Sequence, residues 1–131
     1  MLFTIYGLRV AGTEHVFLIG QTHQRLSERR SGHLERAKKM FAKGFHTPKT
    51  QVIMQALQSG WDIEIIEIDQ LEAQPRYARM SDGSRGSALA SEKVNEREWF
   101  WQQTYLRNQG GPMVINGEKV FSWSLVPTPQ D

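Results

Sequence analysis

The sequence contains no cysteine. This absence excludes a disulfide framework, a thiolate metal site and a thiol nucleophile. Long apolar runs are absent as well, and none approaches the roughly 20 residues that a membrane-spanning helix needs. The opening residues, MLFTIYGLRV, lack the basic start and the small-residue cleavage site of a signal peptide. We therefore expect a cytoplasmic protein that has no membrane partner.

What is present is a globular composition with an uneven distribution of charge. Of the 131 residues, 39% are hydrophobic and 23% are charged, which suits one domain with a buried core. The segment from Gln21 to Thr50 contains eight basic and two acidic residues, so its charge of +6 leaves −4 for the rest of a chain whose net charge is +2. Such a segment indicates a polyanionic partner, although an exposed helix with a merely solvating basic face has the same composition.

Alternation and turn residues predict three strands. Residues 2–10 and 15–20 are rich in β-branched and aromatic side chains, and the turn AGTE between them predicts an antiparallel hairpin. Residues 61–68 alternate apolar and acidic side chains, which predicts a third strand. A bulge in it would explain why Ile66 and Ile68 are out of phase with the earlier apolar positions.

Periodicity predicts three helices. The first spans residues 24–43, where apolar side chains recur every three or four positions. The second has Thr47 as its cap, Pro48 at its first position and Gly60 after its end. The third runs from about residue 88 or 91 to Asn108, before two glycines. We expect a single α+β domain with a small antiparallel sheet of about three strands flanked by helices.

Two segments fall outside these elements. The Gly/Ser-rich stretch SDGSRGS predicts a loop over about residues 72–88 that is mobile or ordered only by a ligand. Near the C-terminus, MVINGEKVFSW predicts a hairpin about Asn116 and Gly117.

The stretch NEREWFWQQTYL places a carboxylate on an apolar helix face. Four side chains fall on one stripe, at offsets of 4, 3 and 4: Val94, Glu98, Trp101 and Tyr105. Because an unpaired carboxylate is costly to bury, we expect Glu98 either to become neutral or to find a cation. That cation could be Arg29 or Arg97 in a structural ion pair, or a divalent metal ion.

Two residues on the first helix could share a site with this carboxylate. Arg29 and His33 are four positions apart, at the edge of the apolar stripe, and Tyr6 lies on the first strand with its face undetermined. Gathered in one cleft with Glu98, they could hold Mg²⁺, bind a phosphoryl group and move a proton, which is the chemistry of phosphodiester hydrolysis. Taken singly, His33 is more often a partly buried hydrogen-bonding residue than a catalyst, and Tyr6 is more often a core aromatic. Spacing alone does not bring them together.

Several motifs occur in a familiar order. TIY at residues 4–6 is followed after eleven residues by LIG at 18–20, then by GQTHQRLSERRSGHL, KGFHTPKTQ and EREWFW. In this order and at these intervals the chain resembles the GIY-YIG nuclease family, most closely the small catalytic domains of phage-type homing endonucleases. The resemblance implies a DNA endonuclease that hydrolyses phosphodiester bonds with Mg²⁺ or Mn²⁺ as its cofactor.

The resemblance also implies a role for each matching residue. Glu98 would hold the metal, Arg29 would bind the scissile phosphate, and Tyr6 would position or deprotonate the water, with His33 supporting proton transfer. The DNA-binding residues would be Arg25, Arg30, Arg36, Lys38, Lys39, Lys43, His46, Lys49 and Asn116. The partner would be double-stranded DNA, with a protein partner or a dimer for targeting left open.

Two departures from the family pattern keep alternatives open. Thr4 replaces the glycine of the first motif, and Leu18 replaces the tyrosine of the second, whose hydroxyl it cannot supply. Phe17 is expected to point to the opposite face of its strand and has no hydroxyl either. The rival functions are a catalytically impaired DNA-binding or accessory protein and, more distantly, a protein-interaction domain.

Overall fold

The computed structural model describes residues 1–89 and 91–109, which form two sheets and three helices. The larger sheet is antiparallel with strand order β2-β1-β3, and its strands are β1 (Leu2–Val10), β2 (Val16–Thr22) and β3 (Ile63–Glu72). The helices are α1 (Leu26–Ala42), α2 (Pro48–Gln58) and α3 (Glu92–Gln109). The smaller sheet pairs β4 (Arg76–Arg79) with β5 (Arg85–Leu89). The expected α+β class with a three-stranded antiparallel sheet is confirmed.

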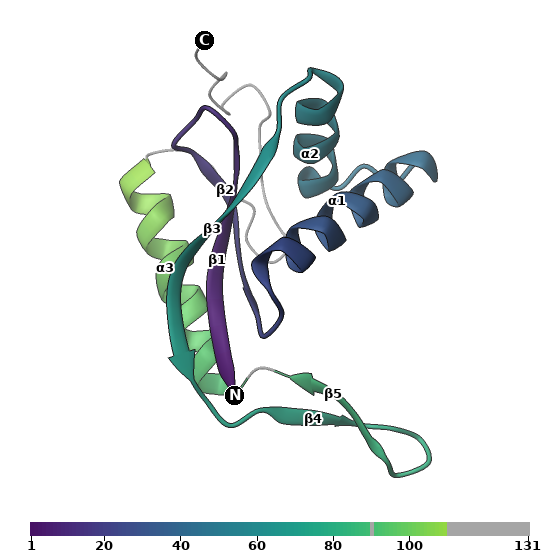
Figure 1. The fold of residues 1–131 in the computed structure, drawn as a ribbon, viewed down its shortest axis with the longest axis vertical. Coiled ribbons are helices and arrows are strands. Elements are labelled where there is room, and N and C mark those ends of the chain that lie inside the picture. The colour runs from purple at the N-terminus through teal and green to yellow at the C-terminus, as the bar shows by residue number, and fades with distance from the viewer. Residues whose placement is uncertain (90, 110–131) are drawn as a thin grey trace.

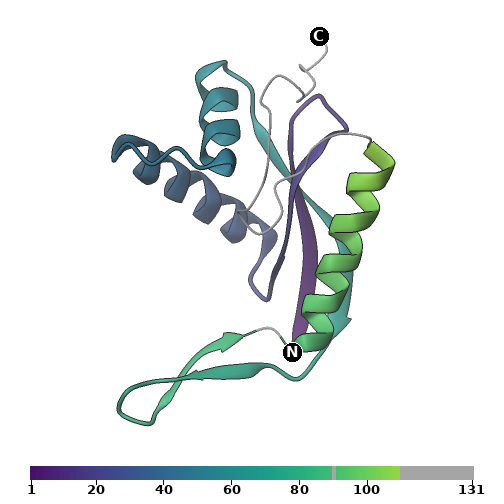
Figure 2. The same cartoon turned by 180° about the vertical axis from the view of Figure 1, so that it is seen from behind.

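The sheet lies between two helical layers, with α1 and α2 on one side and α3 on the other (Figures 1 and 2). Because side chains alternate along a strand, the central strand β1 supplies both layers. Tyr6 and Leu8 join the core under α1 and α2, whereas Phe3 and Ile5 join the core under α3. The face of Tyr6, which the sequence left undetermined, is therefore the α1 side.

A bulge in β2 changes one expectation. Leu8 pairs with Leu18, whereas Arg9 pairs with Val16, so Phe17 is an extra residue in the ladder. Phe17 and Leu18 consequently belong to the same core cluster, under α1 and α2. The expectation that Phe17 points to the opposite face is wrong, because strict alternation fails at a bulge.

The bulge suggested for the third strand is present. Ile5 pairs with Asp69 and Tyr6 pairs with Glu67, which leaves Ile68 as the extra residue. The strand is longer than the apolar pattern indicated, since its pairing with β1 continues to Glu72.

The helices follow their predicted signals with shifts at the ends. Thr47 caps α2 by accepting a hydrogen bond from the Thr50 backbone N–H at 3.2 Å, and Gly60 follows the helix with a φ of 80°. By contrast, α1 begins two residues later than expected, at Leu26, with Arg25 at a position that makes no side-chain capping bond.

The segment expected to be an irregular loop contains a β-hairpin. β4 and β5 pair across a turn in which Gly83 has a φ of 85° and Asp82 accepts hydrogen bonds from Ser84. A left-handed residue at a tight turn is suited to glycine. The Gly/Ser-rich residues therefore form a turn between two short strands. The expectation of an irregular loop over this segment is wrong.

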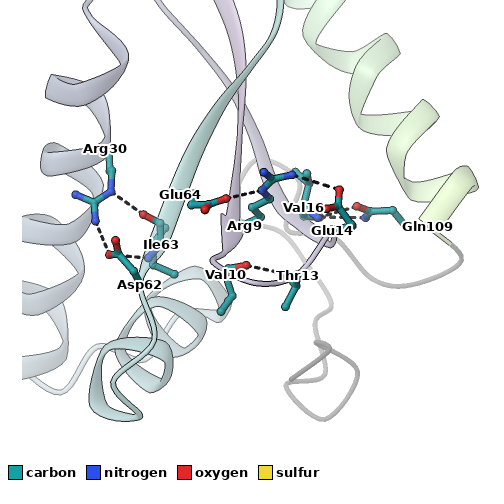
Figure 3. Close-up of polar contacts among 10 residues, drawn as sticks. All are labelled: Arg9, Val10, Thr13, Glu14, Val16, Arg30, Asp62, Ile63, Glu64 and Gln109. Carbon is teal, nitrogen blue, oxygen red and sulfur yellow. Dashed lines mark hydrogen bonds and ion pairs between the residues drawn. The ribbon is translucent and has the colours of Figure 1, made fainter. Parts of the chain in front are cut away.

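Ion pairs fasten the layers together at the end of the sheet where β1 turns into β2. Arg9 contacts Glu64 at 2.8 Å and Glu14 at 3.4 Å (Figure 3). Arg30 of α1 reaches β3, where it donates to Asp62 Oδ1 and to the Ile63 carbonyl, both at 2.6 Å (Figure 3). The Arg9 contacts join the strands and the turn, and the Arg30 contacts join α1 to the start of β3.

Glutamine side chains of α3 satisfy the outer edge of β2. Gln109 accepts from the Val16 N–H at 2.7 Å and donates to the Val16 carbonyl at 3.0 Å, as a neighbouring strand would (Figure 3). The fully buried Gln102 donates to the Ile19 carbonyl at 3.2 Å. An edge strand covered in this way is a poor template for pairing with another chain. Within the described ranges, no helix combines the length and apolar character needed to cross a bilayer.

Candidate active site

A polar cavity of about 290 Å³ lies where the two helical layers meet the end of β2. Side chains or backbone from β1, β2, α1, the start of α2 and α3 line it: Tyr6, Leu18, Ile19, Gly20, Gln21, Arg29, His33, Lys49 and Glu98. Its volume is roughly ten times the space that one water molecule occupies, so a phosphate group fits. All four residues expected to be catalytic, Tyr6, Arg29, His33 and Glu98, line this one cavity.

The Tyr6 hydroxyl joins two residues of α1. Its oxygen lies 2.7 Å from His33 Nε2 and accepts a hydrogen bond from Arg29 Nε at 3.0 Å. Tyr6 and His33 are 1% and 6% exposed, so bulk water does not compete for these contacts. Arg29 and His33 reach the same hydroxyl because residues four apart lie on one face of a helix.

His33 is neutral at physiological pH. Burial, which is the largest cause, and the positive charges of Lys49, Arg29 and Arg36 together lower its pKa to about 3. A neutral imidazole has one donor and one acceptor nitrogen, so the direction of the Tyr6 hydrogen bond depends on the His33 tautomer. In the tautomer with an unprotonated Nε2, Tyr6 donates its proton to His33 while its oxygen accepts from Arg29.

Gly20 makes room for this hydroxyl. Tyr6 and Gly20 are partners in the β1–β2 ladder, and a Cβ added to Gly20 would lie 2.5 Å from the Tyr6 oxygen. No real side chain fits there without moving Tyr6. Steric exclusion by Tyr6 therefore explains why glycine occupies position 20, which the sequence alone did not reveal.

Glu98 reaches the cavity from the opposite layer. The Gln21 side-chain amide donates to Glu98 Oε2 at 2.9 Å and to Asn95 Oδ1 at 2.7 Å, which links α3 to the end of β2. Burial raises the Glu98 pKa, and the Gln21 hydrogen bond opposes that effect only in part. A half-buried carboxylate in this state is stabilised by a cation.

The structural ion pair considered for Glu98 is not formed. Arg97 instead contacts Asp69 at 2.6 Å, and the Trp101 indole donates to the same carboxylate at 2.9 Å. Arg29 is occupied by Tyr6. Within residues 1–89 and 91–109, no cationic side chain lies within ion-pair distance of Glu98.

Lys49 is a member of the cavity wall rather than of the outer surface. It lies at the start of α2, and burial lowers its pKa, with Arg36 and Arg29 adding to the effect. The sequence placed Lys49 among the DNA-binding residues without indicating this position. Gln21 was not singled out at all, although it belongs to the GQT motif that directed attention to α1.

The remaining basic residues divide between two sides of α1. Arg25, Arg36 and Lys43 are exposed and lie 4, 7 and 14 positions from Arg29, hence on the cavity side, with Lys39 on its flank. Lys38 lies on the opposite side and contacts Glu35 at 3.5 Å.

Two other expected DNA-binding residues, Arg30 and His46, do not line the cavity. Arg30 is held by Asp62, away from the cavity. His46 is exposed after α1, with its ring 4.9 Å from that of Phe41. Asn116 and the C-terminal hairpin expected around it fall outside the described residues.

A divalent ion could be held at Glu98 without a dedicated protein cage. The described part of the chain contains no cluster of three or more His, Asp or Glu residues arranged to bind a metal. Mg²⁺ commonly uses one or two carboxylates and completes its shell with water and substrate oxygens. The single uncompensated carboxylate of Glu98, beside a cavity for a phosphate, fits that mode of binding.

Comparisons with protein families, curated proteins and solved structures found no match for this chain. The functional assignment therefore depends on the chemistry of the cavity.

Proposed function

We propose that this protein is a divalent-metal-dependent endonuclease of the GIY-YIG type that hydrolyses phosphodiester bonds in double-stranded DNA. The observation that carries the proposal is a single cavity shared by the hydrogen-bonded Tyr6, His33 and Arg29 and by the uncompensated carboxylate of Glu98. The order and spacing of the motifs support it independently.

Phosphate binding is assigned to Arg29 and Lys49. Neither side chain has an ion pair with a carboxylate of the described residues, and both line the cavity. Arg29 uses its Nε for Tyr6, which leaves the two terminal nitrogens for a bidentate contact with phosphate oxygens. An anion would also offset the mutual repulsion that lowers the Lys49 pKa.

Tyr6 and His33 move the proton. As a water molecule attacks phosphorus, its proton passes to the Tyr6 oxygen while Tyr6 passes its own proton to His33 Nε2. The bond from phosphorus to the leaving oxygen then breaks, the leaving oxygen takes up a proton from water, and His33 releases the proton it received because its low pKa disfavours the charged form. Burial raises the pKa of Tyr6, which disfavours a full negative charge on the phenol, while the hydrogen bond and charge of Arg29 stabilise the negative charge that does develop.

Glu98 holds the metal, with Gln21 orienting its carboxylate. Gln21 bonds Oε2, so the other carboxylate oxygen faces no described donor. When bound, Mg²⁺ or Mn²⁺ supplies electrostatic stabilisation of the phosphoryl and leaving oxygens. Around the cavity, Arg25, Arg36 and Lys43 would bind the duplex backbone in a salt-sensitive way that is independent of sequence.

Cleavage of supercoiled plasmid tests the proposal most directly. The protein should nick or linearise the plasmid with Mg²⁺ or Mn²⁺, and a chelator should abolish the reaction. Absence of cleavage with either metal, under conditions in which the protein binds DNA, would contradict the enzymatic proposal.

A second function, DNA binding without efficient cleavage, is favoured by Leu18. This residue lines the cavity and is 7% exposed, so it puts an aliphatic wall where the family has a phenol. If the loss of that hydroxyl impairs catalysis, Leu18→Tyr should raise the cleavage rate above that of the natural chain. An unchanged rate in a folded Leu18→Tyr variant would show that this phenol is not the missing group.

A further inference from the structure

The β4–β5 hairpin projects from the body of the protein. It runs out beyond the end of β3, on the same side of the larger sheet as α1 and α2 (Figures 1 and 2). Its two strands contact chiefly each other, so packing against the core of the protein does not account for the side chains that they carry. Three arginines occupy these strands, Arg76, Arg79 and Arg85, and all are exposed.

The acidic residue of the hairpin is used within the turn. Asp82 Oδ1 accepts hydrogen bonds from the Ser84 N–H at 2.9 Å and from the Ser84 hydroxyl at 2.6 Å. These two bonds lower the pKa of the fully exposed Asp82 carboxyl. Asp82 therefore shapes the tip and forms no ion pair with the arginines of the strands.

Two of the arginines face each other across the ladder. Arg79 pairs with Arg85, and neither has an ion pair with any described residue. Like charges directly opposite on neighbouring strands destabilise a hairpin. A polyanion bound to this surface would offset the repulsion between the two arginines. Their placement opposite each other therefore favours binding of an anion rather than stability of the free hairpin.

One of these guanidinium groups is held in place by an aromatic ring. Arg85 Cζ lies 4.0 Å from the centroid of the half-exposed Tyr77 ring. Stacking on a ring leaves the N–H edge of a guanidinium available and reduces the freedom lost when it binds. That edge matches a phosphate or the major-groove edge of guanine.

We infer that the β4–β5 ribbon is a second DNA-binding element, which enters the major groove of the duplex whose backbone reaches the candidate active site. A two-stranded ribbon fits the width of that groove, and its exposed charge has the required sign. The inference rests on the proposed function for the identity of the duplex, but it concerns binding and not cleavage.

The test compares duplex binding by two charge-matched variants, measured by fluorescence anisotropy with chelator present to prevent cleavage. Arg79→Gln/Arg85→Gln removes two positive charges from the ribbon. Lys38→Gln/Arg107→Gln removes two from exposed positions on the far side of α1 and on α3. Unchanged circular dichroism and melting temperature would show that both variants keep the fold.

At about 0.1 M salt, the ribbon variant should bind a labelled duplex at least about tenfold more weakly, and its slope of log affinity against log salt should be shallower by about 1.8. The control variant should bind within about twofold of the natural chain. Duplex affinity equal to that of the natural chain would overturn the inference. An equal loss on single-stranded DNA would overturn the groove placement, since single strands have no groove.

The plasmid assay separates this inference from the proposed function. Weak binding by the ribbon variant, with no cleavage by the natural chain, would support the ribbon and contradict the nuclease. Cleavage by the natural chain together with unchanged binding by the ribbon variant would do the reverse. No binding of DNA by the natural chain at low salt would overturn both.

Discussion

Arg29 and Arg30 are neighbours on α1, yet they belong to regions that use charge in opposite ways. Arg30 points to the end of the sheet where ion pairs fasten the layers, and it binds Asp62 and the Ile63 carbonyl (Figure 3). Arg29 points into the cavity, where it meets a phenol and no described carboxylate. The first region uses its charges for the fold, whereas the second leaves them available to a ligand.

The two carboxylates of the α3 side show the same contrast. Asp69 accepts hydrogen bonds from Trp101 and Arg97, which lower its pKa. Burial raises the pKa of Glu98, and a single amide opposes it. Charges that only stabilise a fold are normally paired, so the unpaired set around the cavity indicates a binding site.

The largest expected effect separates these two carboxylates. Glu98→Gln should reduce metal-dependent plasmid cleavage about a thousandfold, because the amide cannot replace a charged metal ligand. Its melting temperature should stay the same or rise, since the variant no longer buries a carboxylate. Asp69→Asn should show the opposite pattern, with cleavage retained and stability lower by about 1 kcal/mol. Normal cleavage by Glu98→Gln would refute the metal assignment.

The next effect separates the two arginines. Arg29→Ala should reduce cleavage at least about a hundredfold through loss of the phosphate contact, with little change in melting temperature. Arg30→Ala should keep the cleavage rate but lower the free energy of unfolding by about 1 kcal/mol, because the Asp62 pair is partly exposed. Equal loss of activity in both variants would remove the distinction between the two regions.

A third effect concerns acid stability. The pKa of His33 is about 3 in the folded protein and near 6.5 when unfolded. The contribution of neutral His33 to the free energy of unfolding is therefore fully present above pH 6.5. It is lost as pH falls toward 3, because the unfolded chain takes up the proton first. Between pH 7 and 5 the free energy of unfolding should fall by about 2 kcal/mol from this group.

Urea unfolding of the natural chain and of His33→Gln measures that contribution. The raised pKa of Glu98 acts in the opposite direction, since its stabilising protonated form is gained as pH falls. Glu98 is common to both proteins, so it cancels in their difference. If His33→Gln loses as much stability between pH 7 and 5 as the natural chain, His33 is not the acid-sensitive group.

The smallest effect compares two glycines. Gly20→Ala should reduce cleavage about tenfold, because its Cβ would displace the Tyr6 hydroxyl by which Arg29 and His33 are joined. Gly32→Ala on α1 meets nothing within 4 Å, so it should leave cleavage unchanged and stabilise the helix by about 0.5 to 1 kcal/mol. A Gly20→Ala variant with full activity would show that the position of Tyr6 is not critical.

Local signals in the sequence predicted most of the elements. The three core strands, the three helices, the Thr47 cap and the buried stripe of α3 follow from periodicity and capping chemistry, which act over a few residues. The hairpin at β4 and β5 was missed because its Gly and Ser residues obscured two short strands. The position of Phe17 was wrong because a bulge depends on the partner strand.

The candidate site divides in the same way. The motifs supplied the four proposed catalytic residues, whereas Gln21, the role of Gly20 and the cavity position of Lys49 emerged only when five elements were placed together. Each of these three depends on a contact with a residue distant in sequence, which spacing along one element cannot report.

By itself, the sequence determined the three core strands, the three helices and the order of the motifs, because each depends on residue type and local spacing. Only the tertiary structure decided which charges are paired. Arg29 and Arg30 have the same side chain, but about 100° of helical rotation separates them, so one meets Asp62 and the other meets Tyr6. Whether a charge serves the fold or a ligand is set by that direction.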